Sequence, residues 1–114
     1  LLTPRGMRSL SPQDEKYIGA IEGDEEQRAL AIHQGTAYPW LLGFYADVMV
    51  EVHRNSGISQ LRRIVEDFNS EITEHCIGTI SERYNGNPPH QAKGAISMAW
   101  NVAAILKLMK IVEE

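Results

Sequence analysis

The C-terminal end of the chain contains its most continuous hydrophobic run. Residues 95–112 include fourteen apolar side chains and are interrupted only by Ser97, Asn101, Lys107 and Lys110. Eighteen residues without glycine or proline exceed the length of an ordinary strand, and alanine, leucine, methionine and lysine favour helix. The sequence therefore predicts one long helix here. Because the run is apolar nearly all round, we expect other elements to cover most of it.

A second hydrophobic pattern precedes this run. Apolar residues recur three or four positions apart between residues 58 and 84, at Leu61, Val65, Phe68, Ile72, Cys76 and Ile80. Such a stripe predicts one amphipathic helix over residues 58–84. Residues 85–89, Asn-Gly-Asn-Pro-Pro, form the strongest loop signal in the chain. Because this loop is short, we expect the helices on either side of it to form an antiparallel hairpin.

The stretch from residue 40 to residue 53 fits two patterns. Leu41, Tyr45, Val48 and Val52 recur at helical spacing, but every second residue from Val48 to Val52 is valine, as in a strand. We favour helix, because no second convincing strand exists to pair with this one. A strand that pairs across a dimer is the alternative. The Asn-Ser-Gly sequence at residues 55–57 predicts a turn after this stretch.

The N-terminal third carries two helix-start signals. Residues 11–14, Ser-Pro-Gln-Asp, predict a short helix that ends near Gly23. Residues 24–27, Asp-Glu-Glu-Gln, have the form of a capping box and predict a helix that ends near Gly35. The predicted fold is an all-α bundle of four or five helices with a long antiparallel C-terminal helix hairpin. Residues 1–6 resemble the remnant of a vector-encoded protease site, so residues 7–114 are interpreted as a single helical domain.

Composition and charge narrow the class of function. The net charge of −4 argues against nucleic acid as a partner, because phosphate binding needs clustered lysine and arginine. The lysines of the C-terminal run argue against a membrane span. The single cysteine, Cys76, excludes an intramolecular disulfide and favours a reducing compartment, so we expect a cytoplasmic protein.

His90 and Lys93 form the first candidate site. On a helix they would share a polar stripe with Ser97 and Asn101, and a lysine one turn from a histidine can hold a phosphoryl group on the imidazole. The sequence His-Gln-Ala-Lys-Gly resembles the His-x-x-Lys-Gly core of histidine-phosphotransfer domains. This resemblance implies His90 as the phosphoacceptor and Lys93 as the supporting cation. The alternative is that both are solvated residues near a helix start.

Arg83 and His90 form a second candidate pair, with six residues between them. Their spacing resembles the Arg-x4–6-His signature of HEPN-type ribonucleases, and the resemblance implies RNA cleavage across a dimer interface. Glu71 and His75 lie one helical turn apart, as two metal ligands would, but a structural histidine is the favoured interpretation. We therefore expect no metal and no cofactor.

An aromatic cluster suggests a different role. Tyr38, Trp40, Phe44 and Tyr45 lie close together in the sequence, and residues of these types dominate protein interfaces. Two largely apolar helices in one small domain also offer more hydrophobic surface than the domain can bury. The sequence therefore favours a small regulatory or adaptor protein that binds a protein partner or forms a homodimer through these aromatic residues. Phosphotransfer through His90 and RNA cleavage through Arg83 and His90 are the alternatives.

Overall fold

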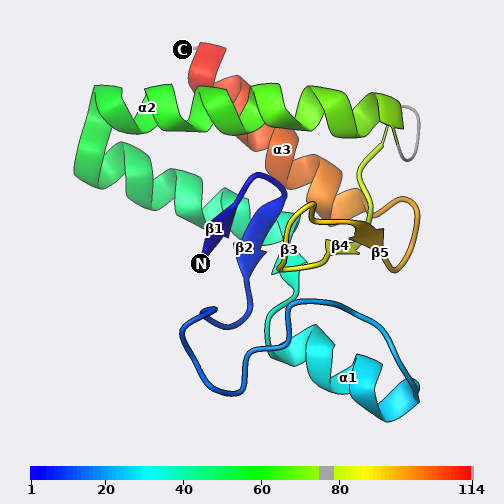
Figure 1. Cartoon of the computed structure of the whole chain (residues 1–114). Coiled ribbons are helices and arrows are strands. Elements are labelled where there is room, and N and C mark those ends of the chain that lie inside the picture. The colour runs from blue at the N-terminus through cyan, green and yellow to red at the C-terminus, as the bar shows by residue number, and fades with distance from the viewer. Residues whose placement is uncertain (75–78, 114) are drawn as a thin grey trace.

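The computed structural model describes residues 1–74 and 79–113 (Figure 1). In this part of the chain, three helices surround a small sheet. The helices are α1 (Glu25–His33), α2 (Leu42–Glu74) and α3 (Ala99–Glu113), and a 3-10 turn, η1 (Pro39–Leu41), leads into α2. The strands are β1 (Leu2–Thr3), β2 (Gly6–Arg8), β3 (Ala37–Tyr38), β4 (Arg83–Tyr84) and β5 (Ala92–Lys93).

The sheet joins distant parts of the chain. Its five strands are antiparallel and lie in the order β1-β2-β3-β4-β5. Met7 of β2 lies opposite Tyr38 of β3, and Ala37 of β3 lies opposite Tyr84 of β4. The N-terminus, the middle of the chain and the segment before α3 therefore meet in one sheet.

This sheet makes the predicted all-α bundle of four or five helices wrong. The described residues form three helices and a five-stranded antiparallel sheet, a mixed α/β arrangement. Each strand has only two or three residues. Such strands are too short to show the alternation of polar and apolar residues by which a strand is predicted from sequence. They form because their partners, supplied by remote segments, satisfy the backbone groups.

The capping-box prediction in the N-terminal third is confirmed, and the other helix predicted there is wrong. The Asp24 carboxylate accepts a hydrogen bond from the backbone nitrogen of Gln27 at 2.8 Å. The Gln27 side chain accepts one in return from the Asp24 nitrogen at 3.0 Å. Residues 11–22 contain no helix. Part of this segment pairs with distant groups, since the Ile21 nitrogen donates to the Asn85 side chain at 2.9 Å.

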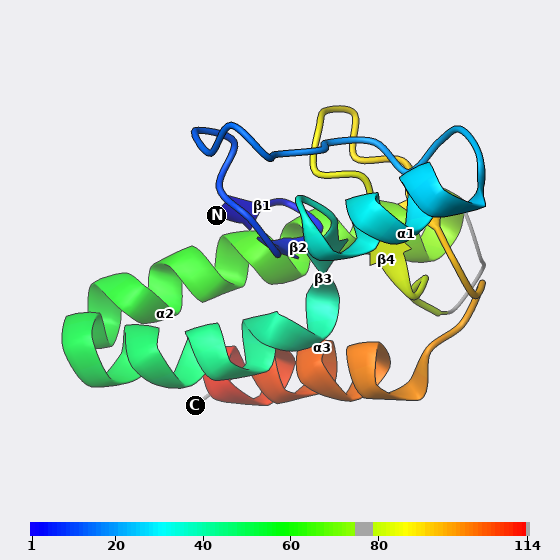
Figure 2. The same ribbon diagram turned by 90° about the horizontal axis from the view of Figure 1, so that it is seen from below.

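Residues 42–53 are helical, as favoured from the sequence. The helical hairpin, however, is made by other segments than the two predicted. In place of the turn expected at residues 55–57, the chain has a kink at Arg54, where φ is 50° and ψ is −119°. There α2 folds back on itself, so that its two halves run side by side (Figures 1 and 2). The helical hairpin is therefore made by the two halves of α2. The predicted hairpin of helix 58–84 with the C-terminal helix is wrong.

The segment between α2 and α3 differs most from the prediction. Helix α2 ends at Glu74 and α3 begins only at Ala99, so residues 80–98, which were expected to be largely helical, contain β4, β5 and loops. Backbone bonds hold this segment in place. The Glu82 nitrogen donates to the Ala95 oxygen at 2.8 Å, and the Met98 nitrogen donates to the Ile80 oxygen at 3.1 Å.

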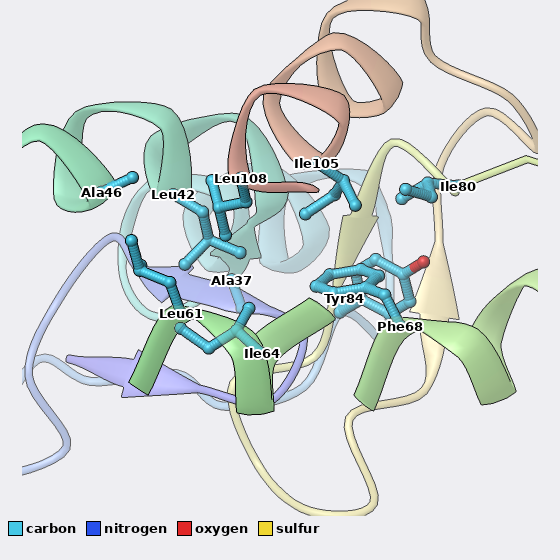
Figure 3. Packing of buried hydrophobic residues seen from close by; sticks show 10 residues of the cluster. All are labelled: Ala37, Leu42, Ala46, Leu61, Ile64, Phe68, Ile80, Tyr84, Ile105 and Leu108. Atoms are coloured by element: carbon cyan, nitrogen blue, oxygen red, sulfur yellow. The ribbon is translucent and has the colours of Figure 1, made fainter. Parts of the chain in front are cut away.

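The hydrophobic core lies where α2, α3 and the sheet meet (Figure 3). Two residues of the predicted stripe, Leu61 and Phe68, are fully buried there, together with Leu108 of α3. The other buried apolar residues of this cluster are Ala37, Leu42, Ala46, Ile64, Ile80, Tyr84 and Ile105. Helix α3 is not covered all round, because Trp100 and Leu106 are more than half exposed. The core therefore uses one face of the C-terminal run.

Residues 1–6 are part of this packing. They form β1 and the beginning of β2, and the Arg5 guanidinium donates to the Asp67 oxygen at 2.7 Å. Their suggested origin in a vector stays a prediction. Among the described helices, none is long and apolar enough to cross a membrane.

Candidate functional site

The β4–β5 hairpin gathers charged side chains on one edge of the molecule. Arg83 of β4 lies opposite Lys93 of β5, and residues paired in this way point to the same side of a sheet. Arg83 and Lys93 line an open pocket of about 510 Å³ together with Glu25 and Arg28 from α1. This volume is within the range of ligand sites. The remaining lining residues are Ile21, Ala29, Ile32 and Gly94.

Glu82 is not one of the lining residues, but it contacts Arg83, which is, and its carboxylate is held by two donors. One carboxylate oxygen, Oε2, accepts a hydrogen bond from the Ala95 nitrogen at 2.8 Å. The other, Oε1, forms an ion pair with the Arg83 guanidinium. Charge-assisted contacts of this kind fix the geometry of a carboxylate. About a quarter of the Glu82 side chain, 24 %, is exposed, so the carboxylate is oriented and still open to solvent.

Gly94 allows the chain to pass close to this carboxylate. Its φ is +74°, a conformation that side chains with a Cβ rarely adopt. A Cβ at this position would lie 2.5 Å from Oε2 of Glu82, well inside van der Waals contact. Glycine is therefore the residue that lets the loop between β5 and α3 present the Ala95 nitrogen to Glu82.

Tyr38 lies in the electrostatic field of the same charged pair. Partial burial raises the pKa of the Tyr38 hydroxyl, Arg83 lowers it, and Glu82 raises it. The hydroxyl donates to the Ile32 oxygen of α1 at 2.8 Å. Tyr38 therefore stays protonated at neutral pH and connects β3 with the helix that forms the opposite wall of the pocket.

Tyr84 anchors the segment from the interior. Its hydroxyl donates to Glu71 of α2 at 2.5 Å and accepts from the Ser81 nitrogen at 3.2 Å. Glu71 is 5 % exposed, and its other oxygen lies 3.6 Å from Nε of Arg5. Burial, together with the hydrogen bond to Glu71, raises the pKa of Tyr84 above its ordinary value of 10.0. A buried polar cluster thus holds the backbone next to Glu82.

The raised pKa of Tyr84 predicts loss of stability in alkali. Unfolding releases a phenol with a pKa near 10.0, so the stabilising contribution is complete below that pH. It declines by at most about 1.4 kcal/mol per pH unit as the pH rises above 10 toward the folded-state pKa. We expect urea midpoints measured between pH 9 and pH 11 to fall less steeply for Tyr84→Phe than for the wild type. Equal slopes for the two proteins would contradict this assignment.

His90 and Lys93 do not form the predicted phosphotransfer site. His90 has φ 61° and lies in the loop between β4 and β5, where its Nδ1 is 3.0 Å from the Asn85 oxygen. Lys93 lies in β5, and Asn101 is buried in α3. A shared polar stripe requires one continuous helix through these positions, and the structure has none. The geometry that the resemblance implies is therefore absent from this described segment.

Arg83 and His90 do not share a helix either. Arg83 belongs to β4 and binds Glu82, whereas His90 binds backbone in the following loop. Within the described chain, the two side chains therefore bind different groups and not each other. The possible metal ligands were Glu71 and His75. The Glu71 carboxylate binds Tyr84, and His75 lies outside the described residues. Among the described residues, no group of three potential ligands gathers.

The four aromatic residues predicted to bind a partner fall into two pairs. Trp40 and Phe44 are 39 % and 65 % exposed, and their rings meet edge to face at 6.1 Å. Tyr38 and Tyr45 are partly buried, and the Tyr45 hydroxyl donates to the Gln60 side chain at 2.9 Å. Partial burial raises the pKa of Tyr45. The predicted partner contact at Trp40 and Phe44 stays a prediction.

Glu82 and Tyr84 were missed by the sequence analysis. Residues 58–84 were assigned to one long helix, in which Glu82 is an ordinary solvated charge. The signal against that helix is the Asn-Gly-Asn-Pro-Pro loop directly after Tyr84, since a hairpin places such a loop between two short strands. Only the pairing of β4 with β3 and β5 shows that Glu82 is held in place.

A comparison with protein families identifies the chain. The model of the family described as amylo-alpha-1,6-glucosidase matches residues 1–107. Comparisons with curated proteins and with solved structures gave no match. The family match overturns the interpretation as a regulatory or adaptor protein, and with it the phosphotransfer and ribonuclease alternatives, because it points to a carbohydrate-processing enzyme. With nearly its whole length matched, the chain belongs to the amylo-alpha-1,6-glucosidase family.

Proposed function

We propose that this protein hydrolyses α-1,6-glucosidic bonds in glucose polymers and that Glu82 is one of the reacting carboxylates. The activity is suggested by the family match. The observation that supports Glu82 is its geometry: a partly exposed carboxylate, fixed by the Ala95 nitrogen and by Arg83, which lines an open pocket. We place the protein in the cytoplasm, as a single cysteine favours.

Glycoside hydrolysis explains why such a carboxylate is needed. Most glycosidases use two carboxyl groups, one that protonates the leaving oxygen and one that acts as a base or as a nucleophile. The base activates a water molecule, and the nucleophile attacks the sugar directly. Both of these roles require a carboxyl group held in a fixed orientation. Glu82 meets this requirement, because a guanidinium and a backbone N–H bind its two oxygens.

The surrounding residues suit a sugar. The pocket is lined by three cations, Arg28, Arg83 and Lys93, which donate hydrogen bonds and accept none. Such donors match the hydroxyl oxygens of glucose. Glu25 also lines the pocket. We assign only Glu82, because two donors hold its carboxylate.

Replacement of Glu82 by glutamine tests the proposal in the full-length protein. Glutamine keeps the shape of the side chain and removes its basicity. We expect kcat for glucose release from an oligosaccharide with an α-1,6 branch to fall by about 10²–10⁴-fold, with KM nearly unchanged. The matched control is Glu66→Gln, since Glu66 is exposed on α2 and we expect its loss to leave both constants unchanged.

Chemical rescue separates a reacting carboxylate from one that only supports the fold. In Glu82→Ala, added azide has room to replace the carboxylate, and we expect it to restore part of the lost rate. Two results would contradict the proposal. One is a wild-type protein that releases no glucose from α-1,6-linked substrates, and the other is a Glu82→Gln variant that keeps wild-type kcat.

A further inference from the structure

The backbone on either side of Glu82 is clamped by one buried side chain. Nδ2 of Asn101 donates to the Ser81 oxygen and to the Glu82 oxygen, each at 2.8 Å. Asn101 lies in the first turn of α3 and is 0 % exposed. One amide nitrogen therefore binds two consecutive carbonyl oxygens, one of them belonging to Glu82 itself.

An amide is the group that this position requires. A primary amide nitrogen carries two hydrogens, so it can satisfy both carbonyls at once, whereas a hydroxyl supplies one hydrogen and an apolar side chain none. The loop near Glu82 is further tied to the start of α3, since the Met98 nitrogen donates to the Ile80 oxygen. Removal of the Asn101 amide leaves the two carbonyls without these donors and lets the segment shift.

Asn101 is poorly explained by stability alone. Its Oδ1 atom is buried and has no hydrogen-bond partner among the described residues. An unpaired buried acceptor costs stability, because it has lost its contacts with water. The neighbouring positions on the inner face of α3 are apolar, among them Ala104 and Ile105. An asparagine in this place is better explained by what its nitrogen holds.

We infer that Asn101 is a positioning residue, which fixes the backbone of Glu82 so that the carboxylate keeps its place between Arg83 and the Ala95 nitrogen. This inference rests on the proposed function of Glu82. Asn101 does not touch the substrate and acts only through Glu82. Its loss should therefore lower kcat and leave substrate binding largely unchanged, because a small displacement of a reacting group is costly to the rate.

The test compares Asn101→Ala with Leu108→Ala in the full-length protein. Both replacements remove a fully buried side chain of α3, but Leu108 packs in the core and does not bind the Glu82 segment. Below the melting temperature of both variants, we expect Asn101→Ala to lower kcat by about 10–100-fold with less than about threefold change in KM. Leu108→Ala should lower the melting temperature and leave kcat within about twofold of the wild type.

A double-mutant cycle adds a readout that a merely structural role would not produce. When Glu82 is already alanine, there is no carboxylate to position, so Asn101→Ala should not lower the azide-rescued rate further. If Asn101→Ala does not fold, Asn101→Ser replaces it. Serine supplies one donor, and we expect its kcat to lie between those of the wild type and the fully disabled enzyme.

The outcomes distinguish the inference from the function on which it rests. Wild-type kcat in a folded Asn101 variant, together with an inactive Glu82→Gln, overturns the inference alone. Equal losses of kcat in Asn101→Ala and Leu108→Ala also overturn it, because the effect then follows stability. Wild-type activity of Glu82→Gln overturns the proposed function itself.

Discussion

Replacing Phe68 with alanine is expected to lower the free energy of unfolding by about 3–5 kcal/mol. Phe68 is fully buried in the second half of α2 and belongs to the core cluster that also contains Tyr84 (Figure 3). The Arg5 guanidinium also lies 5.5 Å from the centre of this ring, at the distance of a cation–π contact. Alanine would leave a cavity in this core cluster.

Urea denaturation followed by circular dichroism measures this loss. The matched control is Phe44→Ala, since Phe44 is also on α2 but is 65 % exposed. Its edge-to-face contact with Trp40 is worth at most about 1.5 kcal/mol. Equal shifts of the urea midpoint in the two variants would contradict the location of the core.

Replacing Gly6 with alanine is expected to lower the free energy of unfolding by about 2–4 kcal/mol, through backbone strain and overpacking. Gly6 begins β2 and has φ +142°, a conformation that glycine adopts easily and alanine does not. A Cβ there would lie 2.5 Å from the carbonyl carbon of Tyr38 in β3. The obstacle is backbone, so relief requires β2 and β3 to separate.

Gly43→Ala is the matched control for this prediction. Gly43 lies in α2, and a Cβ there would meet the Ala104 side chain at 3.8 Å, an ordinary van der Waals contact. Alanine favours helix more than glycine does. The free energy of unfolding of this variant should therefore equal that of the wild type or exceed it by up to about 1 kcal/mol. Thermal unfolding measures both variants. A Gly6→Ala protein as stable as the wild type would show that β2 does not pack closely on β3.

Local patterns in the sequence predicted the helices best. The capping box at Asp24 uses groups only three residues apart, so the sequence specifies it without help from the rest of the chain. The stripe that contains Leu61 and Phe68 likewise predicted which face of α2 is buried. Both features depend on spacings within a few residues, which is the range over which helical hydrogen bonds and side-chain faces repeat.

The candidate site depended on contacts that such patterns do not encode. His90 and Lys93 were expected on one helix, because the run that ends the chain suggested helix after the two prolines. In the structure, backbone groups of the segment before α3 form hydrogen bonds with other segments. The Ala95 oxygen accepts from the Glu82 nitrogen, and the Ala95 nitrogen donates to the Glu82 carboxylate. The pairing of Arg83 with Lys93 across two strands brings both cations to the pocket that α1 also lines, and Glu82 binds Arg83.

The sequence by itself determined the capped helix at Asp24 and the helical character of α2 and α3. These follow from propensity and periodicity, which act over neighbouring residues. The tertiary structure alone decided the sheet and the environment of Glu82. Strands of two or three residues gain stability only from partners far along the chain, so their pairing and the orientation of Glu82 exist only in the folded molecule.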